Sequence, residues 1–414
     1  MSLWAGRVEG SLDPAVWEFL RADDAELLPY DCEATAEHAQ RLHAAGLLTD
    51  DELSEAETLL SELAQDPAGY LESDEDVHTS IERRLGDVGR KIHAGRSRND
   101  QVVAALRLYV LDACAEAREE IDALALVALS LAEGETDTLM PGYTHLQRGQ
   151  PVTLGHHVLA WVEMLDRDRS RFAAAAEAAA ASPLGAGAVA GSTLGLPAPA
   201  GQLRNSIDAV ADRDFALDYL YAAALLFVHL SRIGEEIVLW STSEFGFVRL
   251  PETAATGSSM MPQKLNPDVA ELARGKAGTA IGRLTGLLAT VKGLPLAYDR
   301  DLQEDKASVF ATRRDVRLAL QALTVLVSGL EVDRERLGEA ASDPLLLATD
   351  AAEALVVEGT PFREAHERVA ATVRDGAFEA AGDAAASVAA RGAPGPGGAR
   401  DAVAAARQRF GDNL

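Results

Sequence analysis

The sequence predicts an all-α protein with a central bundle of long helices. Residues 102–133 contain no Gly or Pro, and their apolar positions recur at steps of three, four or seven, as at Val103, Leu106 and Val110. This spacing indicates one amphipathic helix, about 48 Å long at 1.5 Å per residue. Strand-like alternation is nearly absent from the chain. Four further ranges show the helical pattern: 152–181, 207–245, 267–292 and 302–330.

In chain order, the pattern divides the protein into three predicted domains. A mostly helical N-terminal domain covers residues 1–100, the long-helix bundle covers 101–343, and a small helical domain covers 344–414. Pro and Gly gather at 182–201, which predicts a long internal loop, and again at 392–398. Loops as long as the first are usually functional or disordered in compact proteins.

Composition is that of a globular protein with a large core. Of the 414 residues, 48% are hydrophobic, which is enough for an extensive interior and more than one domain. Cys32 and Cys114 match no disulfide framework or metal-binding spacing, so we expect a reducing cytoplasmic setting. The first residues lack the pattern of a signal peptide, and no apolar stretch is long enough to span a bilayer. We therefore expect no membrane partner.

Acidic residues outnumber basic ones by a wide margin. The chain carries 65 Asp and Glu against 38 Lys and Arg, a formal net charge of −27, and only five of the basic residues are Lys. Such a surface argues against nucleic acid as a partner. Acid excess with few lysines suggests a salt-loving source, although an ordinary acidic protein is the alternative.

Stability should then depend on salt. Charge repulsion destabilises the compact state at low salt, and at molar salt a screening length of about 3 Å removes most of it. We expect the free energy of unfolding to fall as salt is lowered to the millimolar range, measured by denaturant titration across a salt series. Stability that stays constant down to millimolar salt would contradict the halophilic interpretation.

The segment 257–268, Gly-Ser-Ser-Met-Met-Pro-Gln-Lys-Leu-Asn-Pro-Asp, is the most informative part of the chain. It brings two serine hydroxyls, the ammonium of Lys264 and the carboxamide of Asn266 into nine residues. Removing a proton from carbon next to a carboxylate needs a base and fixed positive charge close together, and this segment supplies both. An ordinary surface loop before a helix starting at Pro267 is the alternative.

Residues 95–101, Gly-Arg-Ser-Arg-Asn-Asp-Gln, come directly before the first long helix. Asn99 or Asp100 would make a good N-cap, which is the structural alternative. Two arginines flanking Ser97 indicate carboxylate binding, because a helix N-terminus offers free N–H donors beside forked guanidinium groups. Ser97, Arg98 and Asn99 are therefore candidate binding residues.

Residues 142–151 supply a candidate acid or base. His145 stands beside Thr144 and Gln147 in what we predict to be a polar turn between two helices. Histidine titrates near neutral pH, which suits proton transfer. A hydrogen-bonded structural histidine is the alternative.

Two charged segments complete the set of candidates. Residues 298–306, Tyr-Asp-Arg-Asp-Leu-Gln-Glu-Asp-Lys, open a further helix, and Gln303 and Lys306 share a face of it because they are three apart. A charged surface turn is the alternative for this segment. In residues 75–82, His78 either lies next to the site or belongs to a solvated acidic helix start.

Together these segments resemble one known family. The run at 257–268 is similar to the signature loop of the fumarase/aspartase superfamily, and the run at 95–101 resembles the argininosuccinate lyase branch specifically. The resemblance covers nearly the whole chain. It implies a three-domain fold in which five long helices from each subunit form a twenty-helix core in a homotetramer. It also implies active sites assembled from three subunits.

The resemblance implies roles by position. Ser258 is the implied base that takes the β-proton of the succinyl group, and Lys264 and Asn266 stabilise the resulting aci-carboxylate. His145, oriented by Glu271, is the implied general acid or its relay. The implied contacts are Ser97, Arg98, Asn99 and Thr144 for the carboxylates, and Tyr298, Gln303 and Lys306 for the arginine end. The implied reaction is the reversible cleavage of argininosuccinate to L-arginine and fumarate, the last step of arginine biosynthesis, with no metal or organic cofactor.

The chain departs from the family pattern near its start. The stretch 19–23, Phe-Leu-Arg-Ala-Asp, lacks the Ser that in the family usually helps to hold substrate, so the sequence assigns no residue to an N-terminal substrate contact. Two alternatives stay open. A sister enzyme such as adenylosuccinate lyase or aspartase is disfavoured by segments 95–101 and 298–306. A non-catalytic, crystallin-like relative is disfavoured because Ser258 and His145 are both retained.

Overall fold

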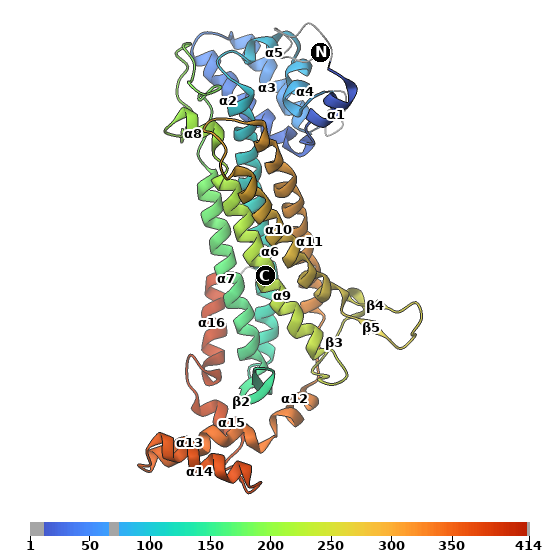
Figure 1. The fold of residues 1–414 in the computed structure, drawn as a ribbon, viewed down its shortest axis with the longest axis vertical. Coiled ribbons are helices and arrows are strands. Elements are labelled where there is room, and N and C mark those ends of the chain that lie inside the picture. The colour runs from blue at the N-terminus through green and yellow to red at the C-terminus, as the bar shows by residue number, and fades with distance from the viewer. Residues whose placement is uncertain (1–11, 66–73, 412–414) are drawn as a thin grey trace. The chain divides into compact units, whose positions relative to one another are not determined.

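The computed structural model describes residues 12–65 and 74–411, and helices dominate it (Figure 1). The five longest described helices are α6 (Arg98–Gly134), α7 (Leu154–Ala179), α9 (Asp214–Trp240), α10 (Asp268–Val291) and α11 (Asp305–Ser328). The shorter ones are α1 (Pro14–Leu20), α2 (Leu28–Ala44), α3 (Asp50–Gln65), α4 (Val77–Arg84), α5 (Gly86–Ile92), α8 (Ser206–Ala211), α12 (Arg334–Ala341), α13 (Ala348–Val357), α14 (Phe362–Arg374), α15 (Ala384–Ala390) and α16 (Ala399–Phe410). Short 3-10 segments are η2 (Ala25–Leu27), η4 (Glu252–Ala254), η5 (Arg300–Glu304), η6 (Pro344–Leu347) and η7 (Pro396–Gly398). The all-α fold class is confirmed.

In the described part of the chain, the strands are short and form three antiparallel pairs. They are β1 (Leu139–Thr144), β2 (Gln147–Thr153), β3 (Val248–Arg249), β4 (Thr256–Gly257), β5 (Leu265–Asn266) and β6 (Glu331–Val332). β1 pairs with β2, β3 with β6, and β4 with β5. The pairs β1–β2 and β4–β5 each enclose a turn or loop, β3–β6 joins two distant segments, and none of the three builds a core sheet.

The chain folds into two compact units. The described residues of Met1–Arg118, Ser170–Leu225 and Gly278–Val316 form the first unit, and those of Glu119–Arg169, Leu226–Ala277 and Arg317–Leu414 form the second. Each of the five long helices contributes residues to both units. The division into domains 1–100, 101–343 and 344–414 stays a prediction.

In the first unit, Asp100 fastens the loop 182–201 to the start of α6. Its carboxylate accepts hydrogen bonds from the backbone N–H groups of Gly185 at 3.2 Å and Gly187 at 2.9 Å. The φ angles of these glycines are 96° and 58°, values that residues with a Cβ rarely adopt. The glycine amides of this loop therefore bind a carboxylate of the chain itself.

The predicted helix 207–245 is wrong in its continuity, because the chain breaks between α8 and α9. The Asp212 carboxylate accepts the backbone N–H of Asp214 at 2.8 Å, just where α9 begins. Asp side chains that bond nearby N–H groups compete with helix continuation. The break lets Arg213 turn inward, where its Nε donates to Asp305 Oδ2 at 2.6 Å.

In the second unit, α7, α9 and α10 pack closely. The rings of Trp161 and Trp240 stack with centroids 5.6 Å apart. A Cβ added at Gly234 of α9 would lie 2.6 Å from the carbonyl oxygen of Ala270 in α10. Glycine is therefore needed where these two helices meet.

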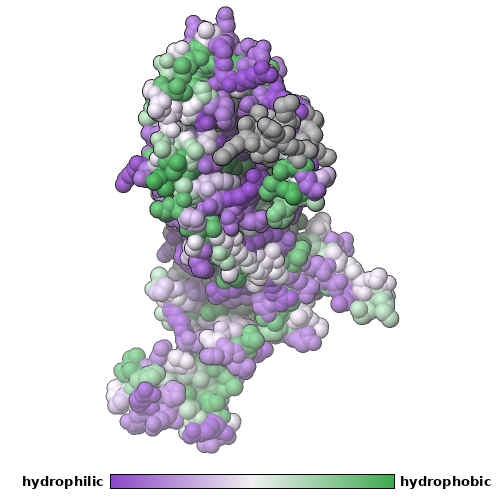
Figure 2. Space-filling view, turned by 45° about the horizontal axis from the view of Figure 1, so that its top comes forward, coloured by the Kyte–Doolittle hydropathy of each residue, from purple (hydrophilic) through white to green (hydrophobic). Residues whose placement is uncertain are grey.

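The surface is largely hydrophilic on the face shown in Figure 2, with hydrophobic patches between polar areas. The helix α10 exposes three large apolar side chains, those of Leu272, Ile281 and Leu288. It also carries four glycines at which an added Cβ would meet nothing within 4 Å: Gly275, Gly278, Gly282 and Gly286. Among the described helices, none combines the length and apolar character needed to cross a bilayer.

Candidate active site

A cavity of about 190 Å³ in the first unit collects most of the predicted binding residues. The sequence-predicted residues that line it are Arg98, Asn99, Tyr298, Gln303 and Lys306. The other lining residues are Ala22, Asp24, Glu75, Asp76, His78, Val102 and Arg300. Segments 95–101 and 298–306, far apart in the sequence, thus meet at one concave site.

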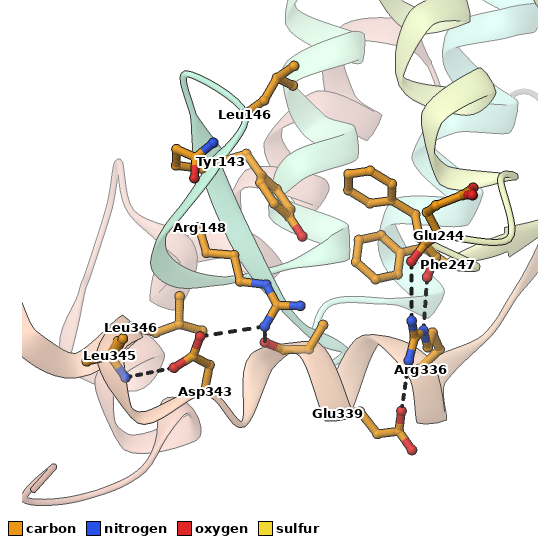
Figure 3. Close-up of a pocket in the computed structure, with 13 residues that line it drawn as sticks. Tyr143, Leu146, Arg148, Glu244, Phe247, Arg336, Glu339, Asp343, Leu345 and Leu346 are labelled. Atoms are coloured by element: carbon orange, nitrogen blue, oxygen red, sulfur yellow. Dashed lines mark hydrogen bonds and ion pairs between the residues drawn. The ribbon is translucent and has the colours of Figure 1, made fainter. Parts of the chain in front are cut away.

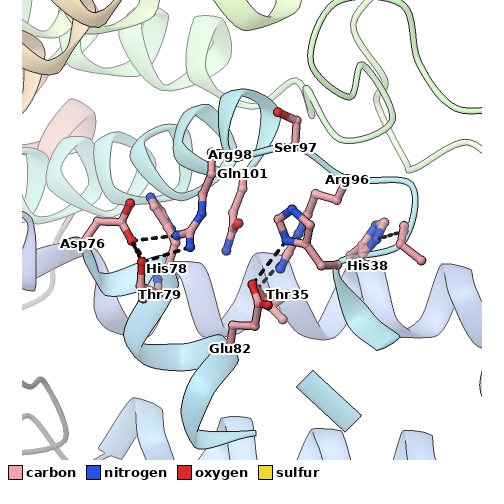
Figure 4. A network of polar contacts seen from close by, with 12 residues as sticks. Thr35, His38, Asp76, His78, Thr79, Glu82, Arg96, Ser97, Arg98 and Gln101 are labelled. Atoms are coloured by element: carbon pink, nitrogen blue, oxygen red, sulfur yellow. Dashed lines mark hydrogen bonds and ion pairs between the residues drawn. The ribbon is translucent and has the colours of Figure 1, made fainter. Parts of the chain in front are cut away.

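Arg98 reaches the cavity as the first residue of α6. Its guanidinium group forms an ion pair with Asp76 at 2.6 Å and donates to Thr79 Oγ1 at 3.0 Å (Figure 4). Thr79 in turn donates from Oγ1 to Asp76 Oδ1 at 2.7 Å. This network fixes one guanidinium edge beside the cavity.

The start of α6 is a capping box, and its N-cap is Ser97. The Ser97 hydroxyl accepts the N–H of Asn99 at 3.3 Å, while the Asp100 carboxylate accepts the N–H of Ser97 at 2.9 Å. The expectation that Asn99 or Asp100 caps this helix is therefore wrong. Ser97 is outside the lining of the cavity, and its predicted contact with substrate stays a prediction.

Tyr298 enters the cavity from a strained turn. The residue before it, Ala297, has φ of 69°, which costs energy for any residue with a Cβ. Tyr298 packs against a buried apolar cluster that contains Ala186, Ala209 and Val210. Burial is the main cause that raises the pKa of the Tyr298 hydroxyl. The Tyr298 side chain is therefore a neutral hydrogen-bonding group that is held in place by its packing against this cluster.

Lys306 is held by a buried charge cluster. Its ammonium lies 3.0 Å from Asp305 Oδ1, and Arg213 binds the other oxygen of the same carboxylate. Burial alone would raise the pKa of Asp305, but Lys306 and Arg213 outweigh it and hold the pKa below its usual range. One carboxylate thus positions two cations, of which Lys306 faces the cavity.

Residues near the N-terminus also contribute to the cavity and its surroundings, although the sequence assigned none of them to the site. The carbonyl of Leu20 accepts hydrogen bonds from Arg300 at 2.7 Å and from Gln303 Nε2 at 3.3 Å. Asp24 and Glu75 also line the cavity, and Glu75 forms an ion pair with Arg300 at 2.9 Å. The sequence did not indicate these residues as part of the site, because Leu20 contributes only its backbone carbonyl and acidic residues such as Asp24 and Glu75 are common in this chain.

Ser258 lies in the second unit, on the loop between β4 and β5. Its Oγ accepts the backbone N–H groups of Met260 at 3.3 Å and Met261 at 3.1 Å. Two donors on one hydroxyl favour its deprotonated form. Lys264 is exposed on the same loop, and its backbone N–H donates a hydrogen bond to the carbonyl oxygen of Met261 at 3.1 Å. Figure 1 shows this loop extended away from the neighbouring helices.

His145 lies in a turn between the helices α6 and α7, as predicted, but the turn is the tip of a β-hairpin whose strands the sequence did not predict. β1 and β2 pair in register from Leu139 with Thr153 to Thr144 with Gln147, leaving His145 and Leu146 as the two turn residues. Their φ values are 57° and 56°, where Asn and Gly are the usual residues. Strain kept at both positions is typical of a functional site.

A larger cavity of about 550 Å³ lies beside the turn end of this hairpin, where Tyr143, Leu146 and Arg148 line it (Figure 3). Two ion pairs lie in its lining: Arg148 reaches Asp343 at 3.6 Å, and Arg336 binds Glu339 at 3.3 Å. Arg336 also donates to the carbonyl oxygens of Glu244 and Phe245. None of the predicted site residues lines this cavity. Its size alone does not make it the reaction site.

Within the second unit, the predicted catalytic residues stay apart. Glu271 pairs with Arg274 of its own helix at 3.5 Å, and no described contact joins it to His145. Asn266 Nδ2 donates weakly to Thr256 Oγ1 at 3.5 Å. The pairing of His145 with Glu271 stays a prediction. Among the described residues, no group of three or more His, Cys, Asp or Glu side chains could hold a metal ion.

The helical fold, the segment 257–268 and the cavity lined by basic and acidic side chains are those of a lyase. A family model described as Lyase matches residues 21–282, and one described as Argininosuccinate lyase C-terminal matches residues 345–389. The solved EDDS lyase in complex with formate is 27% identical with a TM-score of 0.79, covering 97% of this chain and 90% of that one. A class II fumarase from Schistosoma mansoni is 15% identical with a TM-score of 0.72, covering 86% and 88%, and shares the fold.

Two curated relatives indicate which family of lyases the chain belongs to. The argininosuccinate lyase of Frankia casuarinae is 52% identical over 387 residues, which are 89% of this chain and 83% of that protein. The argininosuccinate lyase of Acidothermus cellulolyticus is 50% identical over 388 residues, with 89% and 79% covered. The chain belongs to the argininosuccinate lyase family. This membership favours argininosuccinate lyase over the sister enzymes left open by the sequence.

Proposed function

We propose that this chain catalyses the reversible elimination of argininosuccinate to L-arginine and fumarate, the last step of arginine biosynthesis. The observation that carries the proposal is the convergence of Arg98, Asn99, Tyr298, Gln303 and Lys306 on one cavity. Together they offer cationic and amide donors, which suit a substrate with several carboxylates. The names of the curated relatives support the same reaction.

Ser258 is the proposed base. Its alkoxide takes a proton from the succinyl carbon next to a carboxylate, and the electron pair of that C–H bond moves into the carboxylate. The N–H groups of Met260 and Met261 on Oγ support this role, because they stabilise the alkoxide. Lys264 and Asn266 stabilise the aci-carboxylate, where negative charge develops.

His145 completes the elimination. The aci-carboxylate collapses, a carbon–carbon double bond forms, and the bond between carbon and the guanidino nitrogen breaks. That nitrogen keeps the electron pair and receives a proton from His145 or through it, with Glu271 orienting the imidazole. Fumarate and arginine leave. The strained position of His145 at the hairpin tip supports a functional role.

The proposed binding residues form two groups, one for the carboxylates of the substrate and one for its arginine end. Ser97, Arg98, Asn99 and Thr144 hold the carboxylates. Tyr298, Gln303 and Lys306 hold the arginine end. No metal or organic cofactor is needed, since proton transfer and fixed charge supply the chemistry.

We place the enzyme in the cytoplasm as a homotetramer whose active sites each draw on three subunits. The five long helices of each subunit would form a twenty-helix core. Support comes from α10, whose exposed leucines, isoleucine and open glycines suit close packing against a second copy. Cys32 and Cys114, both free and buried, suit a reducing compartment.

Mixing two inactive variants tests the sharing of sites. Ser258→Ala and His145→Asn should each be nearly inactive, and subunit exchange between them should restore part of the activity. The reason is that some sites in the hybrid take an intact Ser258 loop from one subunit and an intact hairpin from another. Activity is followed by fumarate absorbance after dissociation and reassembly of the mixture. Each variant exchanged with itself is the control, and no recovery in confirmed hybrids would contradict shared sites.

The direct test of the reaction is an assay on purified protein. Argininosuccinate is added at high salt, and the absorbance of fumarate is followed. Fumarate release with stoichiometric arginine supports the proposal. Release from adenylosuccinate or aspartate alone would contradict it, and no turnover of any of the three would favour a crystallin-like relative.

A further inference from the structure

The wall of the 190 Å³ cavity formed by α4 and by the segment before η2 holds two polar groups for which the proposed reaction gives no role. These are the imidazole of His78 and the carboxylate of Asp24, 3% and 1% exposed. The three other cations in the lining each have an acidic partner: Arg98 has Asp76, Arg300 has Glu75, and Lys306 has Asp305. In contrast, Nε2 of His78 is buried without a hydrogen-bond partner among the described residues, and the carboxylate of Asp24 accepts a backbone N–H from Val77.

His78 offers a donor to the cavity. Its Nδ1 lies 2.8 Å from Asp31 Oδ2, and its buried Nε2 has no hydrogen-bond partner among the described residues. Asp31 is itself anchored by Gln101 Nε2 at 2.9 Å. Burial acts to lower the pKa of His78, but Asp31 outweighs it and raises the pKa. The raised pKa favours the protonated imidazole, in which the unpartnered Nε2 carries an N–H that can donate to an anion. Figure 4 shows it in the cluster that holds Arg98 and Asp76.

Asp24 offers an acceptor to the same cavity. One of its oxygens accepts the backbone N–H of Val77 at 3.1 Å. Burial raises its pKa to about 6, against the opposing charges of His78 and Lys306. A buried carboxylate with so little compensation is costly, and a bound cation would relieve that cost.

We propose that His78 and Asp24 together bind the α-amino acid head group of the arginine half of the substrate. The α-carboxylate accepts the Nε2–H of His78 beside Lys306, and the α-ammonium donates to Asp24. A donor and an acceptor in one small cavity match a head group that carries both charges on one carbon. Asp31 acts as a positioning residue through His78. The inference rests on the proposed function and adds the recognition of one substrate end.

Binding should depend on pH through Asp24. Its carboxylate is ionised above about pH 6, so arginine affinity should rise with pH from about 5 to 7 and should be flat in Asp24→Asn. The charged or titratable groups around Asp24 in the cavity are Glu75, Asp76, His78, Arg98, Tyr298, Arg300 and Lys306. Of these, His78 has a raised pKa and Asp76 a lowered one.

Calorimetry on the whole protein with three ligands tests the assignment. Arginine carries both head-group charges, agmatine lacks the carboxylate, and 5-guanidinopentanoate lacks the amine. His78→Gln should weaken arginine roughly 10- to 100-fold, the range for a hydrogen bond to a charged group, and leave agmatine within about twofold. Asp24→Asn should weaken arginine and agmatine but not 5-guanidinopentanoate. His43→Gln is the matched control, because His43 also pairs with an aspartate, Asp50, but on the surface.

Three results would overturn the proposal. His78→Gln could weaken arginine and agmatine equally, which is a structural effect. It could weaken succinate and spare arginine, which places His78 at the opposite substrate end. Wild-type protein could bind arginine no better than either analogue, a result that holds even if a variant fails to fold. In each case, continued fumarate release from argininosuccinate would show that the proposed reaction stands and only this inference fails.

Discussion

Ser258→Ala is expected to lower kcat by about 10²- to 10⁴-fold, the usual contribution of a general base. The loop conformation should survive, because Ser258 Oγ only accepts hydrogen bonds from Met260 and Met261 at a partly exposed position. KM should change little, since the proposed substrate cavity is lined by residues of other segments. Steady-state kinetics with argininosuccinate and circular dichroism on the same sample provide the measurement.

Ser259→Ala is the matched control for this substitution. Ser259 is the next residue and is exposed on the same loop, so its loss should change kcat by only a few fold. A Ser258→Ala variant with near-normal kcat would exclude this hydroxyl as the base. Equal, large losses in both variants would point to a general disturbance of the loop.

Asp305→Ala is expected to lower the free energy of unfolding by about 3–5 kcal/mol, the cost of breaking a buried ion pair from one side. Asp305 is fully buried, and Arg213 and Lys306 are nearly so. Without the carboxylate, two cations stay buried with no partner from this position. Lys306 should also leave its place in the cavity, so KM should rise. Denaturant unfolding and steady-state kinetics measure the two effects.

The loss of unfolding free energy in Asp305→Ala should be larger near neutral pH than in acid. The pKa of Asp305 is depressed in the folded state, so its contribution is present above the unfolded value of about 4 and is lost as pH falls through the folded pKa. The difference between wild type and Asp305→Ala should therefore be largest near neutral pH and shrink in acid. Asp301→Ala is the control, because Asp301 is exposed on the preceding turn, and its effect should stay within about 0.5 kcal/mol. A difference that does not shrink in acid would contradict the charge argument.

Helical spacing predicted most of the bundle because it reports local geometry. The ranges around α6, α7, α10 and α11 agree to within a few residues, since a 3.6-residue period is written directly into the apolar positions. The same signal failed at Asp212, where one side chain caps a new helix in place of continuing the old one. It failed again at the hairpin that carries His145, because the Pro and Gly residues there hide strand alternation.

Some residues of the candidate site could likewise be predicted from the sequence, and others could not. Motif spacing and family resemblance predicted Arg98, Tyr298 and Lys306 as binding residues, and all three line one cavity. Nothing in the sequence marked Asp24 as a cavity residue. Its role follows from burial and from its distance to groups on other segments, which a linear pattern does not contain.

The sequence by itself determined the fold class, the family, and the chemical groups available for elimination, because these depend on residue types at fixed spacings. Only the tertiary structure decided which charges are already neutralised. Arg98, Arg300 and Lys306 are each paired with a carboxylate in the folded protein, while Nε2 of His78 has no hydrogen-bond partner among the described residues. The pairs of Arg98 with Asp76 and of Arg300 with Glu75 join distant segments, which only packing brings within about 4 Å of each other.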